Sequence, residues 1–147
     1  MDIKREYYLK ILNAVYKTDF IKIISGIRRC GKSTLLKQFL LQFKENVLYI
    51  NFDEKQNSNL LIKENLEKYI DDFVKRRREV ILALDEIQNV VGFEQLILGY
   101  YQYKNIQIYL TGSNSHMISK QIATKFTGRE LQINITPFNF FEFNDFF

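Results

Sequence analysis

The sequence holds a single cysteine and a single histidine among 147 residues, which is too few for several common kinds of site. One cysteine excludes an intramolecular disulfide framework, and it leaves no set of thiolates and imidazoles for a zinc centre. No apolar run approaches the roughly 18 residues that a membrane-spanning helix needs. The N-terminus carries Asp2 and Lys4 where a signal peptide needs an apolar segment. We therefore expect a soluble cytoplasmic protein whose chemistry comes from Lys, Arg, Asp, Glu, Ser and backbone groups.

Linker-forming residues are also scarce, with six glycines and one proline. Because a domain typically has about 150 residues, we expect residues 1–147 to form one domain that begins with a helix over 3–17.

The formal net charge of +4 is mildly basic. It falls short of the dense positive charge of a dedicated nucleic-acid binder.

What the sequence does have is an alternation between two hydrophobic periods. Apolar residues at helical spacing predict helices over residues 35–43, 62–73 and 93–101, and a short helix over 116–123. Short β-branched or continuously apolar runs predict strands over residues 20–25, 47–52, 80–84 and 106–110, and strict alternation over 131–135 predicts a half-exposed edge strand. Strands that alternate with helices indicate an α/β fold, with a parallel sheet covered by helices on both faces.

Residues 26–33 read Gly-Ile-Arg-Arg-Cys-Gly-Lys-Ser and match the phosphate-loop pattern G-x-x-x-x-G-K-[ST]. Such a loop wraps backbone amides around phosphates, and the helix that follows adds its free N-terminal amides. Lys32 would contact the β- and γ-phosphates, and the Ser33 hydroxyl would ligate Mg²⁺. The predicted nucleotide contacts are Gly26, Ile27, Arg28, Arg29, Cys30, Gly31, Lys32, Ser33 and Thr34.

Two adjacent acids, Asp85 and Glu86, end the apolar strand predicted over residues 80–84. In parallel sheets, ligands bind beyond the carboxyl ends of the strands, so both acids should lie near the phosphate loop. Asp85 can hold Mg²⁺ through water. Glu86 can align, or take a proton from, the water that attacks the γ-phosphate. A carboxylate positioned to act on water indicates a hydrolase rather than a small-molecule kinase. The sequence has no N-K-x-D motif for guanine recognition, which argues against a GTPase.

At this point the sequence resembles the AAA-domain ATPases of bacteria and archaea. The resemblance lies in residues 23–36 (Walker A), 84–90 (Walker B), 111–114 (the end of the sensor strand), and 127–129 with 137–138 (a closing segment). It implies a P-loop core with sheet order 5-1-4-3-2, ATP as nucleotide and hydrolysis as reaction. Members of the family usually continue into a C-terminal domain, whereas this sequence stops at Phe147. We expect a truncated or split member, or a core that acts with a separate partner.

Three further features have two interpretations each. Asn114, or its neighbour Ser113, could hold the attacking water or cap a helix. Arg129 could neutralise charge on the transferring phosphoryl, in its own chain or in a neighbour, or could form a structural ion pair. The basic run at residues 75–78 could bind nucleic acid, but the favoured interpretation is positive charge at a helix C-terminus.

The Phe-rich residues 137–147 would form an adhesive patch if exposed. We expect them either to fold back on this domain or to dock onto a missing domain or a partner, and docking is the favoured interpretation. The sequence leaves the oligomeric state open. The leading functional interpretation is a Mg²⁺-dependent ATPase that couples hydrolysis to a conformational change. The alternative is a nucleotide-binding switch or interaction module with little hydrolysis of its own.

Overall fold

The computed structural model describes residues 5–27, 29–43, 45–113, 118, 120 and 128–136. Within them strands alternate with helices, as the sequence predicts. The elements are α1 (Glu6–Val15), β1 (Ile21–Ser25), α2 (Lys32–Leu40), β2 (Val47–Asn51), the 3₁₀ segment η1 (Lys55–Leu61), α3 (Lys63–Val74), β3 (Val80–Asp85), η2 (Ile87–Asn89), α4 (Phe93–Tyr101), β4 (Ile106–Thr111) and β5 (Glu130–Asn134).

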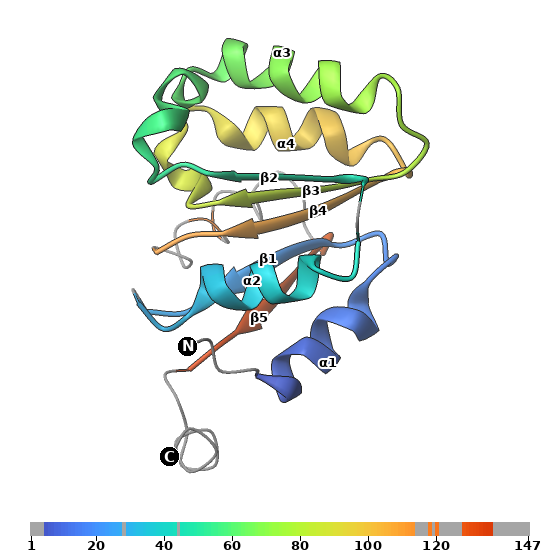
Figure 1. Cartoon of the computed structure of the whole chain (residues 1–147), viewed down its shortest axis with the longest axis vertical. Helices are drawn as coiled ribbons and strands as arrows, with labels where there is room; N and C mark the ends of the chain where they lie inside the picture. The colour runs from blue at the N-terminus through green and yellow to red at the C-terminus, as the bar shows by residue number, and fades with distance from the viewer. Residues whose placement is uncertain are drawn as a thin grey trace.

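The five strands form one parallel sheet in the order β2-β3-β4-β1-β5. This order confirms the expectation of 5-1-4-3-2, read from the other edge. Helices α3 and α4 cover one face of the sheet, and α1 and α2 cover the other (Figure 1). The two predicted layers of helices are therefore present.

The side chains of each central strand alternate between two hydrophobic cores, because successive residues of a strand point to opposite faces. On β3, Leu82 and Leu84 pack in the core beneath α3 and α4. Their neighbours Ile81 and Ala83 pack in the core beneath α1 and α2. Burial on both faces explains why the predicted strand over residues 80–84 is continuously apolar.

The boundaries of some elements differ from the prediction. The first strand begins at Ile21, so the apolar run extends one residue beyond it, and Phe20 is 41% exposed. Helix α1 ends at Val15, since Tyr16 has an extended backbone and Lys17 a left-handed one. The segment η1 was not predicted, and it has no buried residue that could produce a periodic pattern. Most of the helix predicted over residues 116–123 lies outside the described residues.

None of the helices in the described part of the chain is both long and apolar enough to cross a bilayer.

Candidate nucleotide-binding site

The loop between β1 and α2 lies at the carboxyl edge of the sheet, where the strands end (Figure 1). Glycine is required where this loop approaches the chain beyond β5. A Cβ atom on Gly26 would lie 2.6 Å from the Cys30 Sγ and 2.7 Å from the Ile135 carbonyl oxygen. Gly31 has a φ of 94° directly before Lys32, the first residue of α2. Both glycines of the predicted motif therefore have a conformational or steric reason to be present.

Lys32 is buried, and its ammonium group is turned back onto the loop. Its Nζ donates hydrogen bonds to the carbonyl oxygens of Gly26 at 2.8 Å and Ile27 at 3.0 Å. The cation is thus held at the centre of the loop, bonded to the main chain. A phosphate group entering the loop would meet a positive charge already in place.

Ser33, Tyr49 and Asp85 come from three separate elements and lie near one another. The Tyr49 hydroxyl donates a hydrogen bond to the Asp85 carboxylate. Burial, followed by the bond to Asp85 and its charge, raises the pKa of Tyr49, while the nearby Ser33 side chain acts in the opposite direction. The phenol therefore stays protonated and remains a donor. This chain of contacts brings the two predicted magnesium ligands to one place.

Asp85 is fully buried and also accepts a hydrogen bond from the Thr111 hydroxyl at the end of β4. A buried carboxylate without partners would be costly, so the two hydroxyl donors explain how β3 can end in an acid. Mg²⁺ prefers oxygen ligands and usually retains waters and substrate phosphates. The oxygens of Ser33 and Asp85 fit such an ion. The described residues hold no cluster of three or more His, Cys, Asp or Glu side chains suited to a metal.

Glu86 follows Asp85 but faces different partners, because its backbone is left-handed with φ 61° and ψ 48°. Its carboxylate accepts hydrogen bonds from the Ser113 amide at 3.0 Å, from the Ser113 hydroxyl at 2.8 Å and from the Gln88 amide nitrogen at 2.6 Å. Its own amide donates to the Thr111 hydroxyl at 3.0 Å. Strained backbone of this kind occurs at functional sites more often than elsewhere. The two neighbouring acids thus have separate environments.

The remaining loop residues differ in exposure. Ile27 and Arg29 are exposed, Thr34 is half-buried, and the Cys30 side chain is buried with its carbonyl oxygen bonded to Arg5. Arg29 has a left-handed backbone with φ 65°. Arg28 and Asn114 lie outside the described residues, so their predicted roles remain predictions.

A sequence model of the AAA domain matches residues 18–144, which is most of the chain. The chain belongs to the AAA domain family. Family and fold together support a nucleotide-binding P-loop ATPase at this general level.

Relatives of this AAA domain occur in bacteria and archaea. An uncharacterized protein of Haemophilus influenzae is 38% identical over 96% of the chain, and protein MJ1544 of Methanocaldococcus jannaschii is 35% identical over 86%. The chain spans only 37% and 28% of the lengths of these two relatives.

Solved structures with the same fold include Walker-type and other AAA proteins. The Walker-type ATPase PABY2304 of Pyrococcus abyssi has a TM-score of 0.66 at 19% identity, over 99% of this chain and 57% of that protein. A DNA polymerase III gamma subunit-related protein of Thermotoga maritima has a TM-score of 0.64 at 16% identity, over 93% and 48%. At these identities the similarity shows the fold alone.

Arg129 does not join the other predicted site residues of the AAA domain. It lies just before β5, and its carbonyl oxygen accepts a hydrogen bond from the amide of Ile21, the first residue of β1. Parallel strands place their starts at one edge and their ends at the other, so Arg129 lies opposite the loop that follows Ser25. It lines a cavity of about 390 Å³ at that edge together with Thr18 and Lys104. Within its own chain Arg129 therefore lies away from the phosphate loop, and its suggested action on a phosphoryl stays a prediction.

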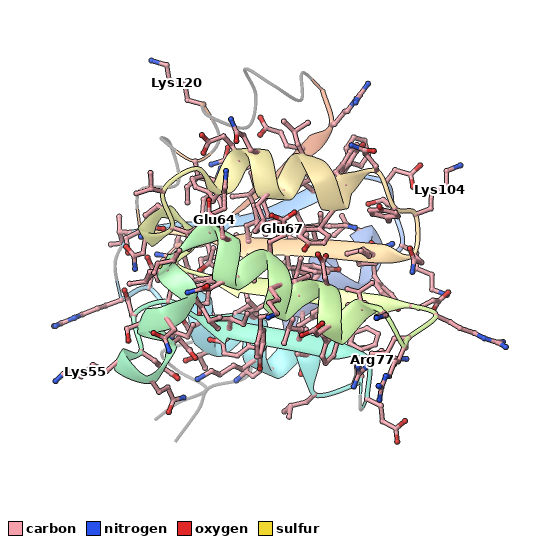
Figure 2. The ribbon with its side chains drawn as sticks, turned by 90° about the horizontal axis from the view of Figure 1, so that it is seen from above. Lys55, Glu64, Glu67, Arg77, Lys104 and Lys120 are labelled. Atoms are coloured by element: carbon pink, nitrogen blue, oxygen red, sulfur yellow. The ribbon has the colours of Figure 1, made fainter. Side chains whose placement is uncertain are left out.

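The basic run at residues 75–78 also lies away from the site, after α3. The Arg77 guanidinium lies 3.7 Å from the centroid of the Phe73 ring and donates to the Phe73 carbonyl oxygen at 2.7 Å. Glu45 and Asp72 share its surface depression, so the surface is of mixed charge. Arg77 and Lys104 lie toward one edge of the molecule, opposite Lys55 (Figure 2). These contacts support the helix-terminal interpretation over a nucleic-acid site.

Sequence reasoning missed Tyr49 and Thr111 as site residues. Tyr49 reads as an ordinary strand residue, and only the pairing of β2 with β3 places it near Asp85. Thr111 belongs to a segment that resembles the family's sensor strand end, and that resemblance was the available signal. Arg5 and Tyr8 were missed because their partners lie far away in sequence.

Proposed function

We propose that this chain binds ATP at residues 26–34 and hydrolyses it with Mg²⁺. The observation that carries the proposal is the grouping of Ser33, Tyr49 and Asp85, with Tyr49 hydrogen-bonded to Asp85, beside the buried Lys32. It joins a phosphate-loop motif to the acid that ends a central strand. This arrangement is typical of sites that hold a nucleotide together with a divalent cation.

In this proposal each residue has one task. Lys32 exchanges its bonds to the Gly26 and Ile27 carbonyl oxygens for phosphate oxygens. Ser33 and Asp85 hold Mg²⁺, which would neutralise charge on the phosphates when bound. Glu86 accepts a proton from the water that attacks the γ-phosphorus, as the bond from that phosphorus to the bridging oxygen breaks and ADP leaves. Asn114 would assist in holding that water, and Arg129 could act only on the nucleotide of a neighbouring subunit.

The second candidate is a nucleotide-binding switch with little hydrolysis. One observation favours it: the Glu86 carboxylate is engaged by Ser113 and Gln88. A carboxylate that keeps these bonds would be unable to serve the attacking water.

The decisive experiment compares the wild-type chain with Glu86→Gln and Lys32→Ala. Glu86→Gln should bind ATP with nearly unchanged affinity and hydrolyse it about 100-fold more slowly, because a positioned base is lost. Lys32→Ala should lose measurable ATP binding, while Lys55→Ala, an exposed lysine on η1, serves as the control. Wild-type binding without turnover would favour the switch, and equal turnover in Glu86→Gln would reject the base assignment.

A further inference from the structure

Arg5, directly before α1, is a buried cation with two main-chain partners that are remote from one another in sequence. It is 3% exposed. Its Nη1 donates to the Cys30 carbonyl oxygen at 3.0 Å, and its Nη2 donates to the Thr136 carbonyl oxygen at 2.6 Å. The guanidinium carbon lies 4.6 Å from the centroid of the Tyr8 ring. A buried charge is tolerated where such contacts replace its lost hydration.

The Cys30 end of this contact lies inside the predicted phosphate loop. When the amides of a loop face an anion, its carbonyl groups need partners elsewhere. Arg5 supplies that partner for Cys30, whose own amide is bonded to the Ile27 carbonyl oxygen at 3.2 Å. Arg5 therefore helps to fix the loop from its outer side.

The Thr136 end lies two residues beyond β5, where the described chain leaves the sheet. The Thr136 amide donates to the Tyr8 hydroxyl oxygen at 3.2 Å, and the Ile135 amide donates to the Ser25 carbonyl oxygen at 2.8 Å. The close approach of Gly26 to Ile135 adds a steric contact. The exit from β5 and the loop after β1 are thus packed together at several points.

We propose that Arg5 is a positioning residue that couples the phosphate loop to the segment following β5. The nucleotide part rests on the proposed function. To contact phosphate, Lys32 has to exchange its bonds to two loop carbonyls, so the loop changes its contacts on binding. Because one guanidinium holds both Cys30 and Thr136, this change reaches Thr136. Coupling of this kind is reciprocal, so movement of Thr136 also changes nucleotide affinity.

The first test needs no nucleotide; it removes one of the bonds that hold Thr136 and measures the effect at Cys30. Tyr8→Phe removes the hydroxyl bonded to Thr136 but keeps the ring against Arg5 and the bonds from Arg5 to Thr136 and Cys30. We expect amide hydrogen exchange at Cys30 to accelerate at least about threefold, relative to β3 amides in the same sample. Tyr7→Phe, an exposed neighbouring tyrosine, is the matched control and should change neither end. Acceleration at Thr136 alone would overturn the coupling, whether or not the chain binds ATP.

The second test adds magnesium and a non-hydrolysable ATP analogue. In the wild type, exchange of the Thr136 amide should slow at least about threefold on binding, because an ordered loop holds Arg5 more firmly. Arg5→Lys keeps the charge but loses the forked geometry, so this slowing should disappear and analogue affinity should fall about tenfold. Equal slowing in Arg5→Lys would overturn the coupling. Absence of wild-type analogue binding would instead reject the proposed function, with the first test still deciding the coupling.

Discussion

The hydroxyl group of Tyr49 on β2 donates a hydrogen bond to the carboxylate of Asp85 at the end of β3. The two strands are neighbours in register, with Tyr49 opposite Ala83 and Asn51 opposite Asp85. Tyr49 thus reaches along the sheet toward its carboxyl edge, where it also meets Ser33. The phenol therefore lies between Ser33, near the start of the helix after the phosphate loop, and the acid that ends a central strand.

Replacing Tyr49 with phenylalanine should therefore destabilise the protein. The variant leaves a fully buried carboxylate with one hydroxyl donor fewer, which costs about 2 kcal/mol. Urea denaturation without nucleotide should show this loss in the free energy of unfolding. Tyr103→Phe, at a tyrosine that is 57% exposed, provides the control. Similar losses in both variants would argue against a special role for the Tyr49 hydroxyl.

Ser113→Ala should increase ATP turnover a few-fold if Glu86 is the base. To reach an attacking water, the carboxylate has to give up its bonds to Ser113 and Gln88. Removing the Ser113 hydroxyl lowers that cost by about 1 kcal/mol, which corresponds to roughly fivefold. Steady-state turnover at saturating ATP measures the effect. The double variant with Glu86→Gln should show no increase, and an increase there would assign the effect to something other than Glu86.

Two glycines offer a matched pair for a test of packing. A Cβ atom on Gly112 would lie 1.9 Å from the Ile118 Cδ1 and 2.6 Å from the Gln88 Oε1, whereas one on Gly99 meets nothing within 4 Å. Gly112→Ala should lower the free energy of unfolding by about 1–3 kcal/mol through overpacking. Gly99→Ala, within α4, should raise it by about 0.5–1 kcal/mol through helix propensity. Changes of the same sign in thermal or urea melts would contradict this account.

Lys22 should make stability depend on pH in the alkaline range. Burial lowers the pKa of its ammonium group from 10.5 to about 8, against an opposing effect of Asp19. Between pH 8 and 10.5 the unfolded chain then binds more protons than the folded chain, so stability rises with pH. Below pH 8 the cost of the buried charge is fully present. Lys22→Met should lack this rise. From pH 7.5 to 9.5 the melting temperature of the wild type should therefore increase relative to that of the variant.

Exposed Lys10→Met is the control for this series and should follow the wild-type curve. Parallel curves for the wild type and Lys22→Met would show that Lys22 does not titrate in this range.

Local patterns were enough to predict the strands of the sheet and the helices that cover it. The central strand over residues 80–84 is apolar on both faces, and the glycine-rich loop follows a strand and precedes a helix, as its chemistry requires. The order of the strands in the sheet could not be predicted from local patterns. It was predicted from the resemblance to a family. Spacing alone does not say which strands are neighbours.

What the sequence could not provide were contacts that depend on register and closure. The partners of Arg5 lie 25 and 131 residues away. Arg129 was expected just before the last strand, and that position is correct. Its separation from the phosphate loop follows only from the parallel sheet, in which strand starts and strand ends lie at opposite edges.

The left-handed backbone at Glu86 has a consequence for how this segment tolerates change. The Asp85 carboxylate accepts hydrogen bonds from hydroxyl groups on β2 and β4, whereas the Glu86 carboxylate accepts them from Ser113 and Gln88. An inserted or deleted residue at this junction would shift the two acids relative to these partners, even if every other residue were kept. The length of this turn is therefore as strict a requirement as the identity of its side chains.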